Sequence, residues 1–353
     1  MGERLTLPDW SSLAAQADES VPLLETALLI ARDEYPDLDP DLYDTLLHSH
    51  AEALRDEVEA IDSWPLKMQA INRHLFDDLG YSGNHDEYYD PRNSYLNEVC
   101  ERRLGNPISL AMVQIDVAHR LGVPLDGVSF PGHFLVRLPV GDSLLVMDPF
   151  NRGRPLDEDE LRERASRHFG GDAPDDDALL RILHPAGNRA ILMRILRNLH
   201  AAYAEREDWE RATRSADRIL HLAPRNREAL RDRGLGYLKL GHLHGARADI
   251  ANYLQRNPDA PDAASLREQL VELGGPGRPH CTTRLERHHL EIVLGHAAVR
   301  AGPGVGHVRP ASARLDALLR QTFGLVIDEA TDDAHPGAEG STGIGCGHWR
   351  DNA

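Results

Sequence analysis

The chain has 353 residues and a formal net charge of −18, which results from 57 acidic and 39 basic side chains. Hydrophobic residues make up 41 % and charged residues 27 %, a composition typical of soluble globular proteins with two or three domains. It excludes both wholesale disorder and a small disulfide-stapled scaffold. The acidic excess argues against nucleic acid as a partner, because duplex binding requires a basic surface.

Compartment and cofactor class follow from features that the sequence lacks. The three cysteines are far apart, which predicts neither a disulfide framework nor a thiol-ligated metal site. The N-terminal segment MGERLTLPDW has no apolar region typical of a secretion signal, and the sequence has no run of about 18 apolar residues. We therefore expect a cytoplasmic protein with no membrane partner, no metal and no cofactor.

Helical periodicity dominates the first part of the chain. After a leader over residues 1–20, apolar residues recur at three- and four-residue spacing from Val21 to about Leu79 and predict three amphipathic helices. Residues 80–97, GYSGNHDEYYDPRNSYLN, are rich in Gly, Asn, Asp and Tyr. This composition predicts a structured loop that packs against the core.

A buried helix and a hairpin are predicted next. In GNPISLAMVQIDVAHRLGVP, Asn106 is suited to cap a helix and Pro107 to its first position, and apolar residues repeat on one face. The runs GVSFPGHFLVRLP and SLLVMDPF flank a turn signal at Gly141 and Asp142. They predict two antiparallel strands that pack on the helix.

The second part of the chain contains an internal repeat. After a short surface helix and an acidic linker, three residue pairs recur at a spacing of 34: Tyr203 with Tyr237, Ala212 with Ala246, and Pro224 with Pro258. This period predicts two helix pairs of the tetratricopeptide type over residues 186–272. Because about three repeats are needed for a stable array, we expect the helix around Asn188 to Leu196 to pack on the preceding domain.

Residues 273–353 differ in character from the rest. They are rich in Gly, Pro, His and Arg and show no sustained period. We interpret them either as a disordered tail or as a frameshifted extension, because an unintended reading frame of GC-rich DNA encodes such a composition.

Three residues in the central segment could form a catalytic triad. Ser109 lies near a helix start, His133 in the first predicted strand and Asp148 at the end of the second. A nucleophile needs a base to take its proton and a carboxylate to orient that base, and a helix N-terminus adds partial positive charge for an oxyanion. Cross-strand pairing in the hairpin could bring His133 beside Asp148.

The residues around these three carry a family resemblance. The transglutaminase-like core of papain-type topology is similar to this chain at GNPISLAMVQ, PGHFLVR and VMDPF. In that core, a cysteine on a helix and a histidine and an aspartate on strands catalyse acyl transfer. INRHLFDDLGYSGNHDEYYDPRNSYLNEVCERRLGNPISL resembles the bacterial transglutaminase-like proteins with C-terminal tetratricopeptide repeats, the Sir-type invasion-regulator family. The resemblance covers about residues 22–272. It implies an α+β core over 21–185, with N-terminal helices and a small antiparallel sheet, followed by all-α repeats.

The sequence departs from the catalytic pattern at one position. Where transglutaminase-like enzymes place cysteine, this chain has Ser109, and an alcohol is much harder to ionise than a thiol. The first hypothesis is therefore a non-catalytic regulatory module, whose cleft and repeats hold a protein or peptide partner. The alternative is a hydrolase or acyltransferase that acts on an amide or ester through Ser109, His133 and Asp148. Direct transcriptional regulation is a third reading, which the acidic charge disfavours.

Each candidate residue also has a structural interpretation. Ser109 at the third helical position is suited to a local hydrogen bond with the backbone, and His133 could be a buried histidine held by Asp148. The loop asparagines could serve an oxyanion or form Asx turns, and the loop tyrosines could line a cleft or anchor the loop. The further candidate binding residues are Tyr88, Tyr89, Asn93, Asn97, Tyr203 and Tyr237.

Overall fold

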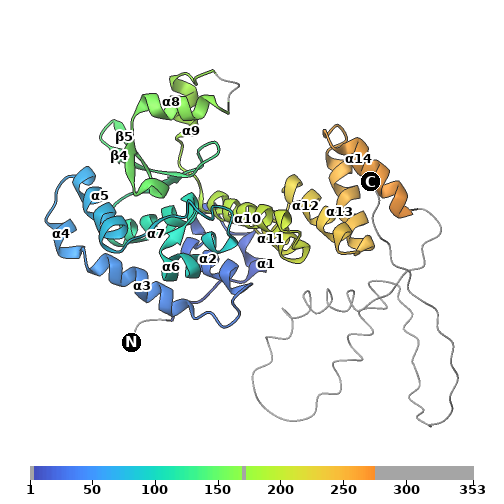
Figure 1. Ribbon diagram of the computed structural model, residues 1–353, viewed down its shortest axis with the longest axis horizontal. Coiled ribbons are helices and arrows are strands. Elements are labelled where there is room, and N and C mark those ends of the chain that lie inside the picture. The colour runs from blue at the N-terminus through green and yellow to red at the C-terminus, as the bar shows by residue number, and fades with distance from the viewer. Residues whose placement is uncertain (1–3, 169–171, 275–353) are drawn as a thin grey trace, which may run out of the picture. The chain divides into compact units, whose positions relative to one another are not determined.

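The computed structural model describes residues 4–168 and 172–274 (Figure 1). All of these described residues belong to one compact unit. The predicted tail therefore lies outside the described residues, apart from its first two positions. Within the described ranges, no helix is both long and apolar enough to cross a membrane.

Short helices form the first part of the fold. They are α1 (Trp10–Leu13), η1 (Asp18–Ser20), α2 (Leu23–Arg32), α3 (Pro40–Glu52), α4 (Arg55–Glu59), α5 (Trp64–Asn72) and the π-helical turn η2 (Arg73–Asp78). The sequence predicts three helices between residues 21 and 79, but the structure has four α-helices before the turn η2. The additional one arises because the second predicted helix is interrupted between α3 and α4. Proline stands in the first turn of both α3 and α5, where its missing N–H is tolerated.

Helix α7 (Pro107–Arg120) lies at the centre of the hydrophobic core. Eleven of its 14 residues are buried, so it is enclosed on nearly every side, as expected for a helix that is apolar around most of its circumference. It contacts α3, α5, α10 and α6 (Leu96–Arg102). The predicted loop before it contains the short turn η3 (Pro91–Asn93) and strand β1 (Ser82–Gly83), which pairs in parallel with β2 (Leu104–Gly105).

A four-stranded antiparallel sheet packs on α7 through β4. Its order is β3 (Asp126–Val128), β4 (Leu135–Val140), β5 (Ser143–Asp148) and β6 (Arg154–Leu156). Val140 pairs with Ser143 across a turn in which Gly141 has a φ of +59°, so the predicted hairpin is confirmed. The outer strands β3 and β6 were not predicted, because each has only three residues and is too short to show an alternating pattern. His133 lies in the turn before β4 and not in a strand, which corrects its predicted position.

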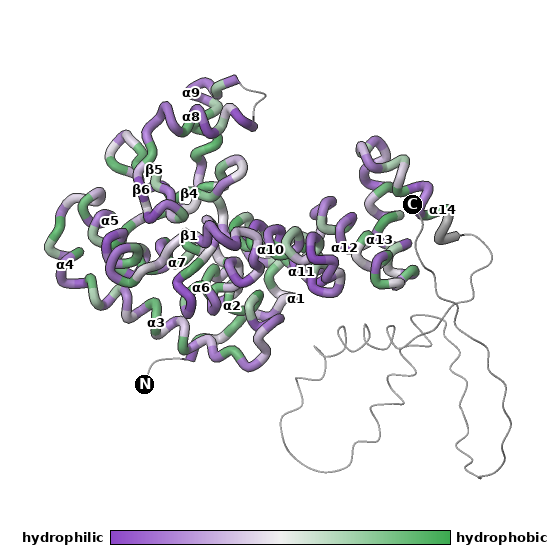
Figure 2. Tube along the Cα trace, in the orientation of Figure 1, coloured by the Kyte–Doolittle hydropathy of each residue, from purple (hydrophilic) through white to green (hydrophobic). Residues whose placement is uncertain are grey.

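Three short helical elements follow or flank the sheet. They are η4 (Pro149–Asn151), α8 (Glu158–Ser166) and α9 (Asp176–Ile182). Most of α8 is hydrophilic, as its purple colour in Figure 2 shows, and only Leu161 and Ala165 are buried. The predicted surface helix after Pro155 is therefore confirmed.

Five helices form the repeat segment. They are α10 (Asn188–Glu205), α11 (Trp209–Leu222), α12 (Arg227–Lys239), α13 (Leu243–Arg256) and α14 (Ala263–Gly274). Ala212 and Ala246 are completely buried, where neighbouring helices approach closely, and Pro224 and Pro258 follow the ends of α11 and α13. The structure thus has the α+β class predicted from the sequence, with a helical repeat segment after the transglutaminase-like part.

A set of ion pairs, which we call the α2–α11 clasp, joins the end of α2 to α11. The Arg218 guanidinium donates to both carboxylate oxygens of Asp33 at 2.7 and 2.9 Å, and it lies 4.9 Å from the centre of the Trp10 ring. Arg211 likewise donates to both oxygens of Glu34. Trp10 belongs to the predicted leader, but it is buried in the core. Helix α10 packs on α2 and α7, as expected from the sequence.

Replacing Asp33 with alanine is expected to lower the free energy of unfolding by about 2 kcal/mol, because a buried guanidinium loses its bidentate partner. Urea denaturation of the full chain measures this loss. The matched control is Glu57→Ala, which removes the exposed partner of Arg73 and is expected to change stability by less than about 1 kcal/mol. Equal losses in the two variants would contradict a special role for the clasp.

His50 on α3 is buried beside other polar groups. Its Nε2 atom lies 3.2 Å from the Tyr81 hydroxyl, and its ring is edge-on to His74. Burial first, and then the charges of His74 and Arg103, lower the pKa of His50 to about 4. The unfolded chain therefore binds more protons between this value and the ordinary one of about 6.5, so stability falls as the pH falls through that range.

Between pH 7 and pH 4, the variant His50→Gln is expected to lose less of its free energy of unfolding than the wild type, because the titrating group is gone. The difference between the two losses should reach up to about 3 kcal/mol. Urea denaturation at several pH values measures the difference. The control His48→Gln changes an exposed histidine on the same helix and should retain the wild-type pH dependence. Parallel curves for His50→Gln and the wild type would refute this account.

Candidate functional site

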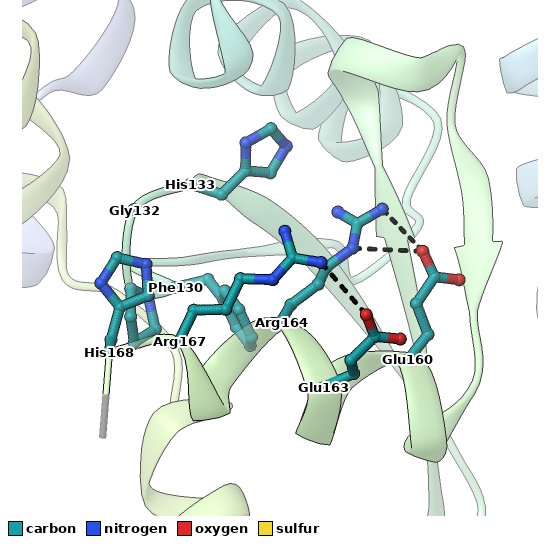
Figure 3. A pocket seen from close by; sticks show the side chains of 9 residues that line it. Phe130, Gly132, His133, Glu160, Glu163, Arg164, Arg167 and His168 are labelled. Atoms are coloured by element: carbon teal, nitrogen blue, oxygen red, sulfur yellow. Dashed lines mark hydrogen bonds and ion pairs between the residues drawn. The ribbon is translucent and has the colours of Figure 1, made fainter. Parts of the chain in front are cut away.

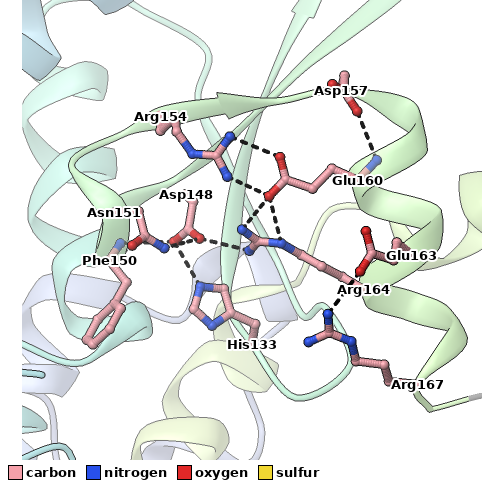
Figure 4. A network of polar contacts seen from close by, with 10 residues as sticks. All are labelled: His133, Asp148, Phe150, Asn151, Arg154, Asp157, Glu160, Glu163, Arg164 and Arg167. Carbon is pink, nitrogen blue, oxygen red and sulfur yellow. Dashed lines mark hydrogen bonds and ion pairs between the residues drawn. The ribbon is translucent and has the colours of Figure 1, made fainter.

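The side chain at the centre of the site is the carboxylate of Asp148, which ends β5 and is completely buried. One oxygen accepts hydrogen bonds from His133 Nε2 at 2.8 Å and from the Phe150 backbone N–H at 3.1 Å. The other accepts from Asn151 Nδ2 at 2.7 Å and from Arg164 at 2.9 Å (Figure 4). Burial alone would raise the pKa of this carboxyl, but the hydrogen bonds outweigh it and hold the pKa well below its usual range.

His133 is positioned by a tight turn. Gly132 has a φ of +68°, a conformation that favours glycine, and the His133 N–H donates to the Phe130 carbonyl at 3.1 Å. Because a carboxylate only accepts hydrogen bonds, His133 Nε2 carries a proton in this contact. Within the described residues Nδ1 makes no hydrogen bond.

Ser109 is not brought together with His133. Its hydroxyl donates to the Asn93 carbonyl at 2.6 Å and accepts from the Asn106 N–H at 3.0 Å, and the Asn106 side chain in turn accepts from the Ser109 N–H. These bonds form a capping box at the start of α7. Ser109 is only 1 % exposed and has no hydrogen bond to His133. The structure therefore brings His133 and Asp148 together and places Ser109 apart from them, in the capping box of α7.

Aromatic rings surround Phe150 next to this pair. The ring centre of Phe150 lies 4.5 Å from that of His85, 5.6 Å from Tyr88 and 6.1 Å from His133. Tyr89 packs edge-on against Tyr88. Tyr88 and Tyr89 remain 39 % and 67 % exposed, so the loop presents aromatic surface to solvent while it is anchored on Phe150.

Two hollows lie near the ring contact of His133 and Phe150, and each of these residues lines one of them. One, of about 410 Å³, lies between His133 and α8 (Figure 3). The other, of about 510 Å³, is bordered by His85, Phe150 and Arg152. Concave surfaces of this kind are where ligands most often bind, so this face of the core is a candidate binding surface.

The remaining predicted binding residues are mostly buried. Asn93 is fully buried, and its side-chain amide donates to the backbone carbonyls of the 80–97 loop. Asn97 is buried on α6. The Tyr203 hydroxyl lies 3.0 Å from that of Tyr95, inside the core, and Tyr237 is half-buried beside Arg233. These placements favour structural roles for Asn93 and Tyr203.

Sequence reasoning missed two residues of the site. Phe150 is visible in the VMDPF motif, but only the structure shows that three rings gather around it. Arg164 lies on a helix that the sequence identifies only as a surface helix, and no local pattern links it to Asp148. Among the described residues, no group of three or more His, Cys, Asp or Glu side chains is arranged to hold a metal ion.

Replacing Asp148 with asparagine is expected to destabilise the fold by about 3 kcal/mol, because one amide cannot accept all four hydrogen bonds and leaves Arg164 without its buried partner. Urea denaturation tests this. Asp126→Asn is the control, since Asp126 is a partly exposed partner of Arg137 and should cost less than about 1 kcal/mol. An unchanged stability for the Asp148 variant would refute its central role.

Comparisons with known proteins match both parts of the chain. Residues 42–197 match the transglutaminase-like superfamily, and residues 199–271 match a tetratricopeptide repeat family. The chain is 67 % identical over 273 residues to a UPF0162 protein of Xylella fastidiosa, covering 77 % of this chain and 97 % of the relative. It is 31 % identical over 273 residues to a UPF0162 protein of Pseudomonas aeruginosa, covering 76 % and 97 %. It is 25 % identical over 217 residues to Protein SirB1 of Salmonella typhimurium, covering 61 % and 79 %.

Proposed function

Because this chain belongs to the UPF0162 family and joins a transglutaminase-like domain to tetratricopeptide repeats, we propose that it is a non-catalytic module that binds an extended segment of a partner protein. Binding without turnover controls the availability of the partner, so the proposed role is regulatory. The proposal places this role in the cytoplasm, on the grounds of sequence alone.

The observation that carries the proposal is the state of Ser109. A nucleophile must be open to substrate and within hydrogen-bond reach of its base, whereas this hydroxyl is sealed and donates to the Asn93 carbonyl. Releasing it would break its hydrogen bond to the Asn93 carbonyl and would leave the Asn106 N–H with only its longer bond of 3.2 Å to that same carbonyl.

The two hollows near His133 and Phe150 support the binding part of the proposal. An extended peptide advances about 3.3 Å per residue, so a few residues suffice to pass from the Phe150 hollow to the His133 pocket. Tyr88 packs on Phe150 and Tyr89 packs on Tyr88, and their exposed rings offer apolar contact area at little entropic cost. The repeats add helical surface of a kind that other proteins use to bind partners.

The first test is labelling with a fluorophosphonate probe, followed by intact-mass analysis. We expect the folded wild type to remain unlabelled, as does Ser109→Ala, while a known serine hydrolase labels quickly under the same conditions. Ser109→Ala should also lose about 2 kcal/mol of stability, whereas Ser166→Ala, which removes an exposed hydroxyl, should lose less than about 0.5 kcal/mol. Labelling that Ser109→Ala abolishes would establish a nucleophile instead.

That outcome would favour the second candidate, a serine hydrolase or acyltransferase acting on an amide or ester. One observation favours it: the His133–Asp148 pair has the geometry of a base and its orienting carboxylate. Turnover of amide or ester substrates, lost in both Ser109→Ala and His133→Gln, would replace the binding proposal.

The second test selects linear peptides from a random library on the full chain and measures their binding by fluorescence anisotropy. Tyr89→Ala is expected to weaken a selected peptide about tenfold or more, because exposed aromatic side chains are frequent hot spots. Leu42→Ala, which truncates a similarly exposed side chain on α3, is the matched control and should leave the affinity unchanged. Equal effects of the two substitutions would refute the proposed path.

A further inference from the structure

The pocket between His133 and α8 has a fixed inner part. Glu160 is held by both Arg154 and Arg164, and Arg164 also donates to Asp148 (Figure 4). All charges in this inner part are therefore neutralised by partners within the chain, and none of these groups is available to a ligand without breaking a network of ion pairs.

Arg167, at the outer side of the same pocket, is held weakly. Its guanidinium makes one hydrogen bond, of 3.1 Å, to Glu163 one helical turn earlier, and the two side chains are 70 % and 71 % exposed. Exposed pairs of this kind contribute only a few tenths of a kcal/mol, so an incoming carboxylate can replace Glu163 at little cost. Figure 3 shows the guanidinium extending across the pocket below His133.

His168 provides a second group that is free to bind. Its ring packs against Gly132, where a Cβ atom would lie 2.5 Å from His168 Nε2, so any larger residue at position 132 would displace the ring. The His168 N–H donates to the Ala165 carbonyl at 2.9 Å, whereas its imidazole makes no hydrogen bond or ion pair with the described residues. The apolar side chains of Phe130 and Pro131 complete the wall.

We infer that this pocket binds a carboxylate of the partner peptide, through the guanidinium of Arg167 and the imidazole of His168; the inference rests on the proposed function. The planar fork of an arginine matches the two oxygens of a carboxylate, and the apolar side chains of Phe130 and Pro131 line the same pocket. Glu163 acts as an internal competitor that occupies Arg167 while the pocket is empty.

The test uses acetate as the probe and acetamide as its neutral analogue of the same shape. Histidine ring resonances of the full chain are followed by NMR at constant ionic strength, with chloride as the replaced anion. Acetate is expected to shift the His168 and His133 resonances in a saturable way, and acetamide is expected to leave them unchanged. Equal shifts with acetamide would overturn the inference.

Two substitutions with opposite expected effects sharpen the test. Arg167→Gln should weaken acetate binding about tenfold, because the charged partner is lost, and Glu163→Gln should tighten it about two- to threefold, because the competitor is lost. Arg73→Gln, which removes another exposed and paired arginine, is the control and should have no effect. Wild-type affinity in Arg167→Gln would refute the inference.

The readout does not depend on a partner peptide. Acetate that fails to bind, in a protein that still binds selected peptides, would overturn this inference alone. If the library gives no peptide that binds, while the protein still binds acetate through Arg167, the proposed function alone would be overturned.

Discussion

The arrangement of the site depends on one buried carboxylate whose hydrogen-bonding capacity is fully used. Asp148 accepts four hydrogen bonds, which come from the turn before β4, from the turn after β5 and from α8. A buried charge is tolerated only when it is compensated in this way, so these three segments must all be in place for the fold to be stable. The orientation of the His133 ring thus follows from the need of the buried Asp148 carboxylate for hydrogen-bond donors.

The start of α7 shows how the same residue types serve either catalysis or folding. Ser109 lies one turn into a helix in the same domain as a His–Asp pair, yet its hydroxyl completes the capping box with Asn106 and fastens the preceding loop through the Asn93 carbonyl. A strained or open helix start would leave that hydroxyl available. Here the capping box and the Asn93 carbonyl hold that hydroxyl, and it is only 1 % exposed.

The sequence was sufficient for the long periodic elements. Helix α7, the β4–β5 hairpin and the repeat helices were all predictable, because their burial pattern extends over many residues. Strands β3 and β6 were not, since three residues carry no usable alternation and their pairing is decided by the neighbours. The burial of Trp10 was also not predictable from the sequence, because it depends on α11, which lies about two hundred residues later in the chain.

The site was predictable in part, for related reasons. His133 and Asp148 were found as a pair because the hairpin brings them close, although His133 proved to lie in a turn. Ser109 was placed correctly near the helix start, but the sequence could not decide which acceptor its hydroxyl would choose. Arg164 approaches Asp148 from a separate helix, and such a contact leaves no local signature in the sequence.

The α2–α11 clasp has a consequence for the synthesis of the chain. Asp33 and Arg218 are 185 residues apart, and a ribosome adding about 5–20 residues per second needs on the order of 10–40 seconds to produce the second after the first. During that interval the nascent N-terminal helices lack the surface that buries Trp10. The emerging chain therefore exposes an aromatic side chain and a cluster of acidic groups until α11 leaves the exit tunnel, and its vulnerable period on the ribosome is set by the position of a single arginine.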